Sequence, residues 1–529
     1  MEKQILIYDT TLRDGTQGEQ INFSAEEKLR IVQKLADLGI QYIEGGWPGS
    51  NPKDIRFFQM AKKARLKKSR LAAFGSTRRA NILPEKDLNL RALLQAETPT
   101  ITIFGKVWDL HVTEILNVSL EENINMIFDS ITYLKSKGKE VIFDAEHFFD
   151  GYKANPRYAL KTIQAAISGG VDIIILCDTN GGTMPHDIQE IMKIVGESFP
   201  GTPLGIHAHN DCGLAVANSI AAVEAGANMV HGTINGYGER CGNADLISTM
   251  ANLQLKLGRK CLDNSKISQL TEISRYVSDI ANIPPLKERP FVGRSAFAHK
   301  GGVHASAISK NPIAYEHIKP EVVGNKRRVL VSDLSGKSNI EYKANEMGLA
   351  LGGNGYDSKK IVKEIKQMED QGYQFDAAEG SLELLMKKST GQFTEPFSLL
   401  SLRVINEKNK DGQSISQATI KISVGQEYEL TAAEGNGPVN AIDNALRKAL
   451  SKFYPTIKGM RLIDFKVRVL EGSAGTAAKV RVLIESRDEK DIWNTVGVSE
   501  NIIEASWQAL VDSMYFKLSK DQTEKTRLH

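Results

Sequence analysis

A unit that recurs eight times in the first 260 residues constrains this chain most: a short apolar segment, a polar or glycine-rich turn and a helical stretch. Several of the apolar segments are near-continuous runs, as expected of parallel strands that are covered on both faces. Eight such units in about 250 residues predict a (β/α)8 barrel. A doubly wound open sheet would show the same alternation, so the repeat alone leaves both folds open. The expected strands are Gln4–Tyr8, Tyr42–Gly45, Leu71–Phe74, Thr100–Phe104, Glu140–Ala145, Asp172–Cys177, Leu204–His209 and Met229–Thr233.

The positions of the polar residues favour the barrel. Acidic, basic, imidazole and amide side chains come directly after the expected strands, at their carboxyl ends. A barrel gathers its active site from those ends, with residues contributed by several different strands. The residues concerned are Asp9, Arg13, Asp14, Glu44, Glu146, Asp178, Thr179, His207, His209, Asn235 and Asn243.

Beyond the barrel, which we assign to residues 1–262, the pattern changes twice. Residues 263–396 combine helical stretches with loop-rich sequence and a break at Asn354–Ser358, and they predict connecting and lid subdomains. In residues 397–520, two copies of a strands-then-helix unit predict a duplicated α/β domain, and residues 521–529 are expected to form a frayed tail. The expected elements are strands Ser398–Asn406 and Ala418–Thr431, helix Pro438–Phe453, strands Leu462–Leu470, Ala477–Ser486 and Ile492–Val496, and a helix near Ile502–Leu518.

Composition excludes several classes of function. The 529 residues carry 67 Lys and Arg against 64 Asp and Glu, so the balance gives no reason to expect nucleic acid or an anionic membrane as partner. The longest apolar run, Val171–Cys177, is far shorter than the ~20 residues of a membrane helix, and we expect no secretory signal. Four cysteines without a CxxC pair are too few for a disulfide framework. We therefore expect a reduced, cytoplasmic, soluble protein.

The strongest local signal is the sequence His207-Ala208-His209-Asn210-Asp211. Alternation along a strand puts His207 and His209 on one face, close enough to share an ion. An isolated pair of this kind is more often two hydrogen-bonded histidines, but here the pair follows a barrel strand among carboxylates from other strands. Imidazole, carboxylate and amide ligands suit Mn²⁺, Zn²⁺, Co²⁺ or Mg²⁺.

Two further motifs, taken together with the histidine pair, support a site for a metal or an anionic ligand. Arg13 and Asp14 are adjacent after the first strand, where the carboxylate can hold a metal while the guanidinium neutralises an oxyanion or a carboxylate. Gly236–Asn243 is a glycine-rich turn whose backbone can approach a ligand. It lacks the GxGxxG register and a Walker lysine, which argues against a nucleotide-binding site. Alone, the first motif could be a surface ion pair and the second a tight barrel-closing turn.

Three motifs, taken in order, resemble a known enzyme family: DTTLRDGTQ (9–17), HAHND (207–211) and NGYGERCGN (235–243). They are similar to those of the 2-isopropylmalate, homocitrate and citramalate synthases, which condense acetyl-CoA with a 2-oxo acid on a metal-bearing barrel. The resemblance continues through HKGGVHASA (299–307), NPIAYEHIKPE (311–321) and EGNGPVNAIDNAL (434–446), the last being similar to that family's regulatory domain. Within the family, EGGWPGSNPKD (44–54) and DAEHFFDGYKANP (144–156) resemble the long-form (R)-citramalate synthases, which use pyruvate.

The resemblance implies a role for each matching residue. The family's metal ligands fall on Asp14, His207, His209 and Asn243. The residues that face or act on the oxo acid, or belong to the lid, fall on Arg13, Glu146, Thr179, His304 and Tyr315. The lid segment of relatives reaches into the partner subunit's barrel, so a homodimer is implied. Many isopropylmalate synthases read HQDG where this chain has residues 304–307 as HASA, which argues against the isopropylmalate assignment.

The implied activity is a Claisen-type condensation followed by hydrolysis of the thioester, with (R)-citramalate and CoA as products. A methyl thioester is a weak carbon acid, so a base must act beside a group that stabilises the enolate. We expect His304, helped by Glu146, to remove the methyl proton, and Arg13 with the metal to stabilise the alkoxide. The product is the first intermediate of the pyruvate route to isoleucine, and the resemblance implies feedback inhibition at the C-terminal domain by a branched-chain amino acid, isoleucine being expected.

The choice of acceptor depends on the resemblance. Pyruvate and 2-oxoisovalerate differ by two methyl groups, which a filled pocket separates by ~1–3 kcal/mol per methylene-sized difference. Phe74 and Phe104 are expected either to fill that pocket or to pack the barrel. The alternative within the family is 2-isopropylmalate synthase, followed by homocitrate synthase. Outside it, a metal-dependent lyase of the hydroxymethylglutaryl-CoA type and an amino-acid sensor built on an inactive barrel are the alternatives.

Overall fold

The computed structural model describes residues 4–528 apart from 65, 67, 350–357, 409, 411 and 471. It divides into two compact units. The first unit contains Met1–Phe297 and Ile318–Lys326, and the second contains Ala298–His317 and Arg327–His529. Among the described residues, no helix is both long enough and apolar enough to cross a membrane.

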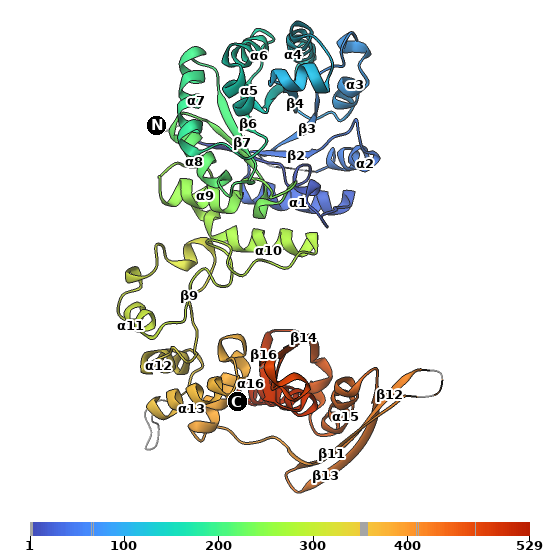
Figure 1. The fold of residues 1–529 in the computed structure, drawn as a ribbon, viewed down its shortest axis with the longest axis vertical. Helices are drawn as coiled ribbons and strands as arrows, with labels where there is room; N and C mark the ends of the chain where they lie inside the picture. The colour runs from blue at the N-terminus through green and yellow to red at the C-terminus, as the bar shows by residue number, and fades with distance from the viewer. Residues whose placement is uncertain are drawn as a thin grey trace. The chain divides into compact units, whose positions relative to one another are not determined.

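Eight parallel strands close the barrel of the first unit (Figure 1), which confirms the predicted fold. Each strand pairs with the next, and β1 closes the ring by pairing with β8 through Leu6 and Met229. The predicted ends differ from the observed ones by at most two residues. The strands are β1 Leu6–Asp9, β2 Tyr42–Gly46, β3 Arg70–Ser76, β4 Thr100–Lys106, β5 Glu140–Glu146, β6 Ile173–Asp178, β7 Leu204–Ala208 and β8 Met229–Gly232.

The helices of the first unit lie outside the ring of strands (Figure 1). Helix α1 shows how the sequence sets their ends. Ser24 and Glu27 form the predicted capping box, and Gly39 ends the helix at φ +102°, where a side chain would be strained. The helices are α1 Ala25–Leu38, α2 Pro52–Ala61, α3 Leu88–Gln95, α4 Leu120–Ser136, α5 Phe148–Ala154, α6 Pro156–Ser168, α7 Pro185–Ser198, α8 Ala215–Glu224, α9 Leu246–Leu255 and α10 Leu270–Ala281.

Alternation along the strands separates two cores. On β4, Ile101 and Ile103 belong to the large core in which the helices pack on the strands, whereas Thr102 faces the interior and bonds the Tyr8 hydroxyl. The interior holds a smaller apolar cluster of residues from the first, second, third, fifth, sixth and eighth strands. The residues above it, at the carboxyl ends of the strands, are the polar ones. This arrangement therefore brings the predicted site residues of the first unit to one end of the barrel.

The second unit begins with small elements. They are β9 Ala298–His299, α11 Gly302–Lys310, β10 Arg328–Val329, α12 Lys337–Glu346, α13 Ser358–Asp370 and α14 Glu379–Ser389. Helices α12, α13 and α14 share a compact apolar cluster that includes Ile340, Ile361 and Leu382. The expected break at 354–358 falls mostly on residues 354–357, which lie outside the described residues.

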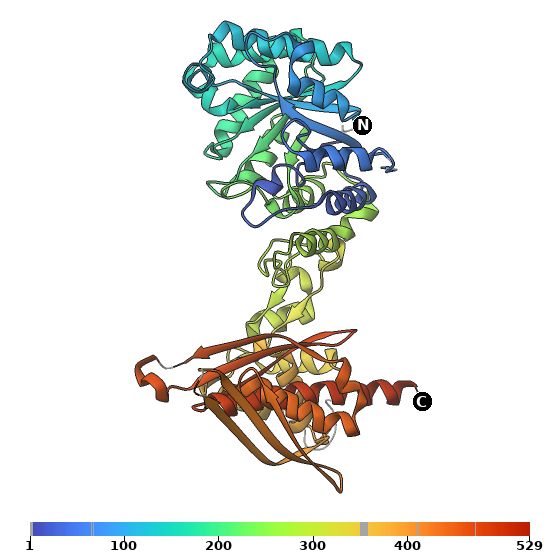
Figure 2. The same cartoon turned by 90° about the vertical axis from the view of Figure 1, so that its right-hand side faces the viewer.

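Two copies of a strands-then-helix unit follow (Figure 2), as the sequence predicts, and each has three strands and one helix. The first is β11 Ser398–Lys408, β12 Ser414–Val424, β13 Glu427–Gly435 and α15 Pro438–Phe453. The second is β14 Arg461–Val469, β15 Val480–Arg487, β16 Ile492–Ser499 and α16 Ile502–Leu528. Helix α16 thus continues through residues that the sequence assigned to a frayed tail.

The single strand expected over Ala418–Thr431 is wrong. The chain reverses there, and Val424 pairs with Glu427 in an antiparallel hairpin. Gly425 lies at the turn with φ +57°, a conformation that costs glycine little. One glycine in an alternating run is a weak turn signal, so the sequence pattern predicts a single strand here.

Candidate active site

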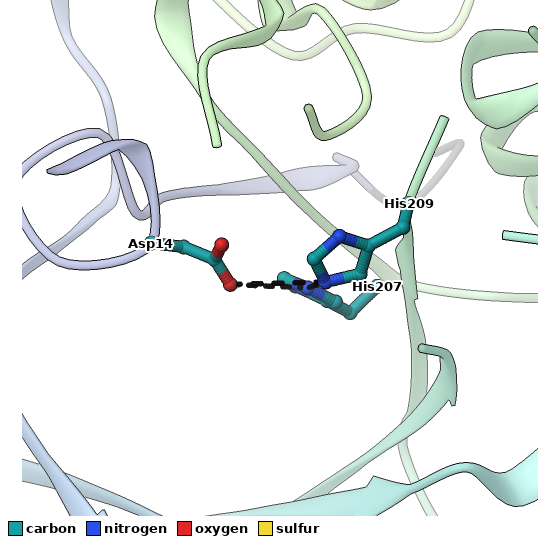
Figure 3. A group of neighbouring side chains, drawn as sticks. All are labelled: Asp14, His207 and His209. Atoms are coloured by element: carbon teal, nitrogen blue, oxygen red, sulfur yellow. Dashed lines mark hydrogen bonds and ion pairs between the residues drawn. The ribbon is translucent and has the colours of Figure 1, made fainter. Parts of the chain in front are cut away.

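Asp14, His207 and His209 meet at the barrel end, as Figure 3 shows. The two imidazole Nε2 atoms lie 3.2 Å apart, and the Asp14 Oδ2 atom lies 3.5 Å from that of His207 and 3.9 Å from that of His209. Asn243 Nδ2 donates to Asp14 Oδ1 at 3.0 Å. All four side chains are buried. The structure therefore brings together the four residues that the sequence singled out as metal ligands.

Local geometry explains this convergence. His207 lies on β7, His209 follows it two residues later, and a bridge joins His209 to Asn243. The glycine-rich turn folds tightly around Asn243, because a Cβ on Gly238 would sit 2.1 Å from its Nδ2 atom. Gly238 also has φ +150°, so a side chain there is strained as well as obstructed. The turn predicted to approach a ligand through its backbone thus positions an amide side chain.

Burial sets the charges of this group. It lowers the pKa of His207 to about 3 and lowers the pKa of His209, so both imidazoles are neutral near pH 7. Burial also favours the neutral acid at Asp14, but the Arg13 guanidinium, the two imidazoles and the hydrogen bond from Asn243 together outweigh it, and the pKa falls to about 2. The cluster therefore presents one carboxylate and two neutral imidazoles, the protonation states in which these groups bind metals.

The side chains fit a divalent cation. Of two neutral Nε2 atoms that face each other at 3.2 Å, at most one can donate. In the described part of the chain, Oδ1 of Asn243 is buried without a hydrogen-bond partner, and a half-turn of the amide would exchange it with the Nδ2 atom now facing Asp14. Two imidazole nitrogens, a carboxylate and an amide oxygen form a donor set that suits a divalent transition metal.

Arg13 links this group to the second strand. It donates to Asp14 Oδ2 at 2.9 Å and to Glu44 Oε1 at 2.5 Å, and its guanidinium lies 3.7 Å from the Phe74 ring centroid. Glu44 also accepts hydrogen bonds from Tyr8 and Thr10, so three donors hold its carboxylate. Arg13 is thereby fixed in position, and its remaining donor capacity is available to an anion or a developing alkoxide.

Glu146 is the last residue of β5, and Thr179 directly follows the neighbouring strand β6. The Thr179 hydroxyl accepts from the backbone N–H of His147, which adopts φ +55° directly after Glu146. Glu146 forms an ion pair with Lys106 at the end of β4. Both predicted residues thus lie at strand ends. The hydrogen bond from the His147 N–H to the Thr179 hydroxyl links the two strand ends.

His304 and Tyr315 lie in the second unit, on and after α11. Their rings stack with centroids 4.2 Å apart, and both side chains are exposed, Tyr315 by 44%. The structure therefore places these two predicted residues side by side, in a different unit from the metal-binding candidates.

Phe74 and Phe104 stack on each other with ring centroids 5.5 Å apart, and Trp47 packs edge-on against both. Phe74 lies under the Arg13 guanidinium, whereas Phe104 lines a cavity of about 430 Å³. The sequence expects each ring either to fill the acceptor pocket or to pack the barrel, and both rings pack on each other and on Trp47.

Sequence reasoning missed three polar residues of the interior: Lys106, Asp144 and His231. The last two are fully buried beside each other, with His231 Nδ1 4.0 Å from Asp144 Oδ1. Burial raises the pKa of Asp144 well above its usual range and lowers that of His231, so this histidine is neutral near pH 7. The alternation that places Thr102 inward also predicts Lys106 inward, and that signal could have found it.

Comparisons with known proteins match three parts of the chain to family models. The family model described as HMGL-like matches residues 4–277, the homocitrate synthase post-HMGL domain-like model matches 291–373, and the LeuA allosteric (dimerisation) domain model matches 376–518. The (R)-citramalate synthase of Geobacter sulfurreducens is 56% identical over 519 residues, covering 98% of each chain. That of Aquifex aeolicus is 56% identical over 525 residues, covering 99% of each. A 2-isopropylmalate synthase of Methanocaldococcus jannaschii is 33% identical over 519 residues, covering 98% of this chain and 95% of its own.

Proposed function

This chain belongs to the (R)-citramalate synthase family, and from that premise we propose that it condenses acetyl-CoA with pyruvate and hydrolyses the resulting thioester to (R)-citramalate and CoA. The observation that carries the proposal is the buried group of Asp14, His207 and His209 with Arg13 beside it. A cation-binding group next to a fixed guanidinium suits a 2-oxo acid, because its carboxylate is negatively charged and negative charge develops on its keto oxygen in the reaction.

A divalent cation held by Asp14, His207, His209 and Asn243 would, when bound, act as a Lewis acid on the keto oxygen of the acceptor. Mn²⁺, Zn²⁺, Co²⁺ and Mg²⁺ are the ions proposed, on the basis of the donor set. Arg13 has the complementary task. Held by Glu44 and Asp14, it neutralises the charge that develops on the same oxygen as the new bond forms.

Proton transfer is assigned to His304 with the help of Glu146. A proton leaves the methyl group of acetyl-CoA, and the C–H electron pair forms a carbon–carbon bond to the keto carbon of pyruvate. The keto oxygen becomes an alkoxide and then a hydroxyl, and water cleaves the thioester to give a carboxylate and CoA. The stacking of Tyr315 on His304 supports a role for this tyrosine in orienting the imidazole. Thr179 is proposed to contact the oxo acid.

We also propose a homodimer formed through the C-terminal domain. The match to a LeuA dimerisation domain supports it, and so do exposed apolar side chains on the sheet that packs against α15. The side chains of five apolar residues of its strands are exposed: Leu399, Leu400, Ile415, Tyr428 and Leu430.

The proposed regulator is a branched-chain amino acid, isoleucine first among them. The matched regulatory domain contains a cavity of about 660 Å³ between α15 and β14, a size suited to a small ligand. Its lining includes charged Asp443 and Arg447 and apolar Leu462 and Phe465, as an amino acid with an apolar side chain requires. We place the reaction in the cytoplasm, because all four cysteines are free thiols.

The test of the proposal is acetyl-CoA-dependent thiol release, compared for pyruvate, 2-oxoisovalerate and 2-oxoglutarate after loading with each metal. We expect a preference for pyruvate that a chelator abolishes and the metal restores. A preference for 2-oxoisovalerate would contradict the acceptor and favour 2-isopropylmalate synthase. Absence of release with every acceptor, despite bound metal, would contradict the condensation itself.

A further inference from the structure

Lys106 and Glu146 are neighbours across two adjacent strands. They are the last residues of β4 and β5 and face each other in the parallel register of that pair. Lys106 comes four positions after Thr102 on the same strand. Because side chains alternate between the two faces of a strand, Lys106 lies on the inward side that Thr102 occupies. The two charged side chains therefore form the uppermost inward-facing layer of the barrel on these strands.

The backbone on both sides of this ion pair is fixed. The carbonyl of Lys106 accepts a hydrogen bond from the buried amide of Asn123 on α4 at 2.8 Å. Immediately after Glu146, His147 turns the chain at φ +55° and donates its N–H to Thr179. Positive φ is uncommon for a residue with a side chain. Because the main chain is held in this way, the freedom that remains at Glu146 belongs to its side chain.

Lys106 restrains that side chain. Its ammonium forms an ion pair with Glu146 Oε2, and the two side chains are 17% and 22% exposed. The ammonium also lies 5.6 Å from the centroid of the Phe104 ring. Partial burial makes such a pair stronger than one in open solvent, because water screens it less.

The lysine of this pair lines a cavity that a ligand can reach. Lys106 and Phe104 line the cavity of about 430 Å³, together with Trp47 and Arg79. A structural ion pair is more commonly found at the surface, between a helix and a strand end, as for Lys135 of α4 and Asp172. The Asp172 residue precedes β6 and so lies at the opposite end of the barrel from the site residues.

We propose that Lys106 is a positioning residue for Glu146, whose side chain it holds in place so that the carboxylate can assist proton removal from the thioester methyl group. The inference rests on the role given to Glu146 in the proposed function. Lys106 then acts through Glu146 and contributes to the chemical step rather than to the binding of pyruvate.

A double-mutant cycle tests this mechanism, with kcat and the KM for pyruvate measured on the metal-loaded full chain. Because a poorly aimed catalytic group can cost up to about 100-fold, we expect Lys106→Met to lower kcat by about 10- to 100-fold. The KM for pyruvate should stay within about twofold. Lys106→Arg, which keeps the cation, should recover most of the loss. In the Glu146→Gln background, Lys106→Met should cause little further loss, because the two residues act as one unit.

Lys135→Met is the matched control, since it removes a lysine from a Lys–Asp pair at the other end of the barrel. It should leave kcat unchanged. Melting temperatures identify variants that fail to fold, and Lys106→Gln replaces Lys106→Met if the latter does so. Additive losses in the double mutant, or a higher KM with unchanged kcat, would overturn the proposal. If Glu146→Gln itself retains full activity, the role of Glu146 in the proposed function fails instead.

Discussion

The mouth of the barrel and the segment Ala298–His317 differ in how firmly they hold their functional side chains. At the barrel mouth, Asp14 and both histidines are at most 5% exposed, and Arg13 and Glu44 bond to their neighbours. In the other segment His304 and Tyr315 are exposed and stack mainly on each other. A rigid group binds a cation without reorganising, whereas an exposed segment can change its conformation when substrate arrives. Metal binding and proton transfer should therefore respond separately to mutation.

The largest effect is expected at the barrel mouth. Asp14→Ala and His209→Ala should each lose bound metal, and condensation should fall by at least about 10²- to 10³-fold because the charge on the keto oxygen is no longer stabilised. Metal content by elemental analysis and thiol release measure the two effects. Asp263→Ala, which removes an exposed carboxylate, is the control. Full metal content in Asp14→Ala would refute the assigned ligand set.

His304→Ala should lower turnover by about 10²- to 10⁴-fold, the range of a general acid or base, without changing metal content. Its melting temperature should match that of the wild type, because exposed positions contribute little to stability. His186→Ala, at an exposed histidine of α7, is the matched control. Turnover near the wild-type rate would contradict a catalytic role for His304. Loss of metal would contradict the separate roles assigned to the two regions.

Glu44→Gln and Glu316→Gln compare buried carboxylates in the two regions. Glu44 bonds to Arg13, and Glu316 is held by Arg327 through two hydrogen bonds of 2.6 Å. Each variant weakens a buried ion pair by about 2 kcal/mol, so each melting temperature should fall by about 4–8 °C. Only Glu44→Gln should also reduce turnover, by about tenfold, because Arg13 loses its restraint. Equal losses of turnover in both variants would contradict the division of roles.

The smallest effect is a pH dependence of stability at Asp9. Burial raises the pKa of Asp9 to about 7, despite hydrogen bonds from Thr11, whereas an unfolded aspartate titrates near pH 4. Between these values the folded chain binds more protons, so the free energy of unfolding of the first unit falls as pH rises from about 4 to about 7. Asp9→Asn should remove up to about 1.4 kcal/mol per pH unit of that slope. Denaturant unfolding at pH 5, 6 and 7 measures it, and an unchanged slope would show that Asp9 is ionised in the folded chain.

Much of the fold was predictable because its signals are local. Apolar runs of strand length, the capping box of Ser24 and Glu27 and the glycine after α1 each depend on a few neighbouring residues. The convergence of Asp14 with both histidines was also predictable, since parallel strands in a barrel end on one side. The hairpin at Gly425 was not, because one glycine does not distinguish a turn from a strand.

The sequence by itself determined the barrel, the duplicated C-terminal units and the residue types of the proposed metal-binding group, because hydrophobic periodicity and the residue types at strand ends are local features of the chain. Only the tertiary structure decided which further side chains meet. Arg13 reaches Glu44, and Lys106 reaches Glu146, because the register between strands sets those distances. Register depends on closure of the whole barrel, and no short stretch of sequence encodes it.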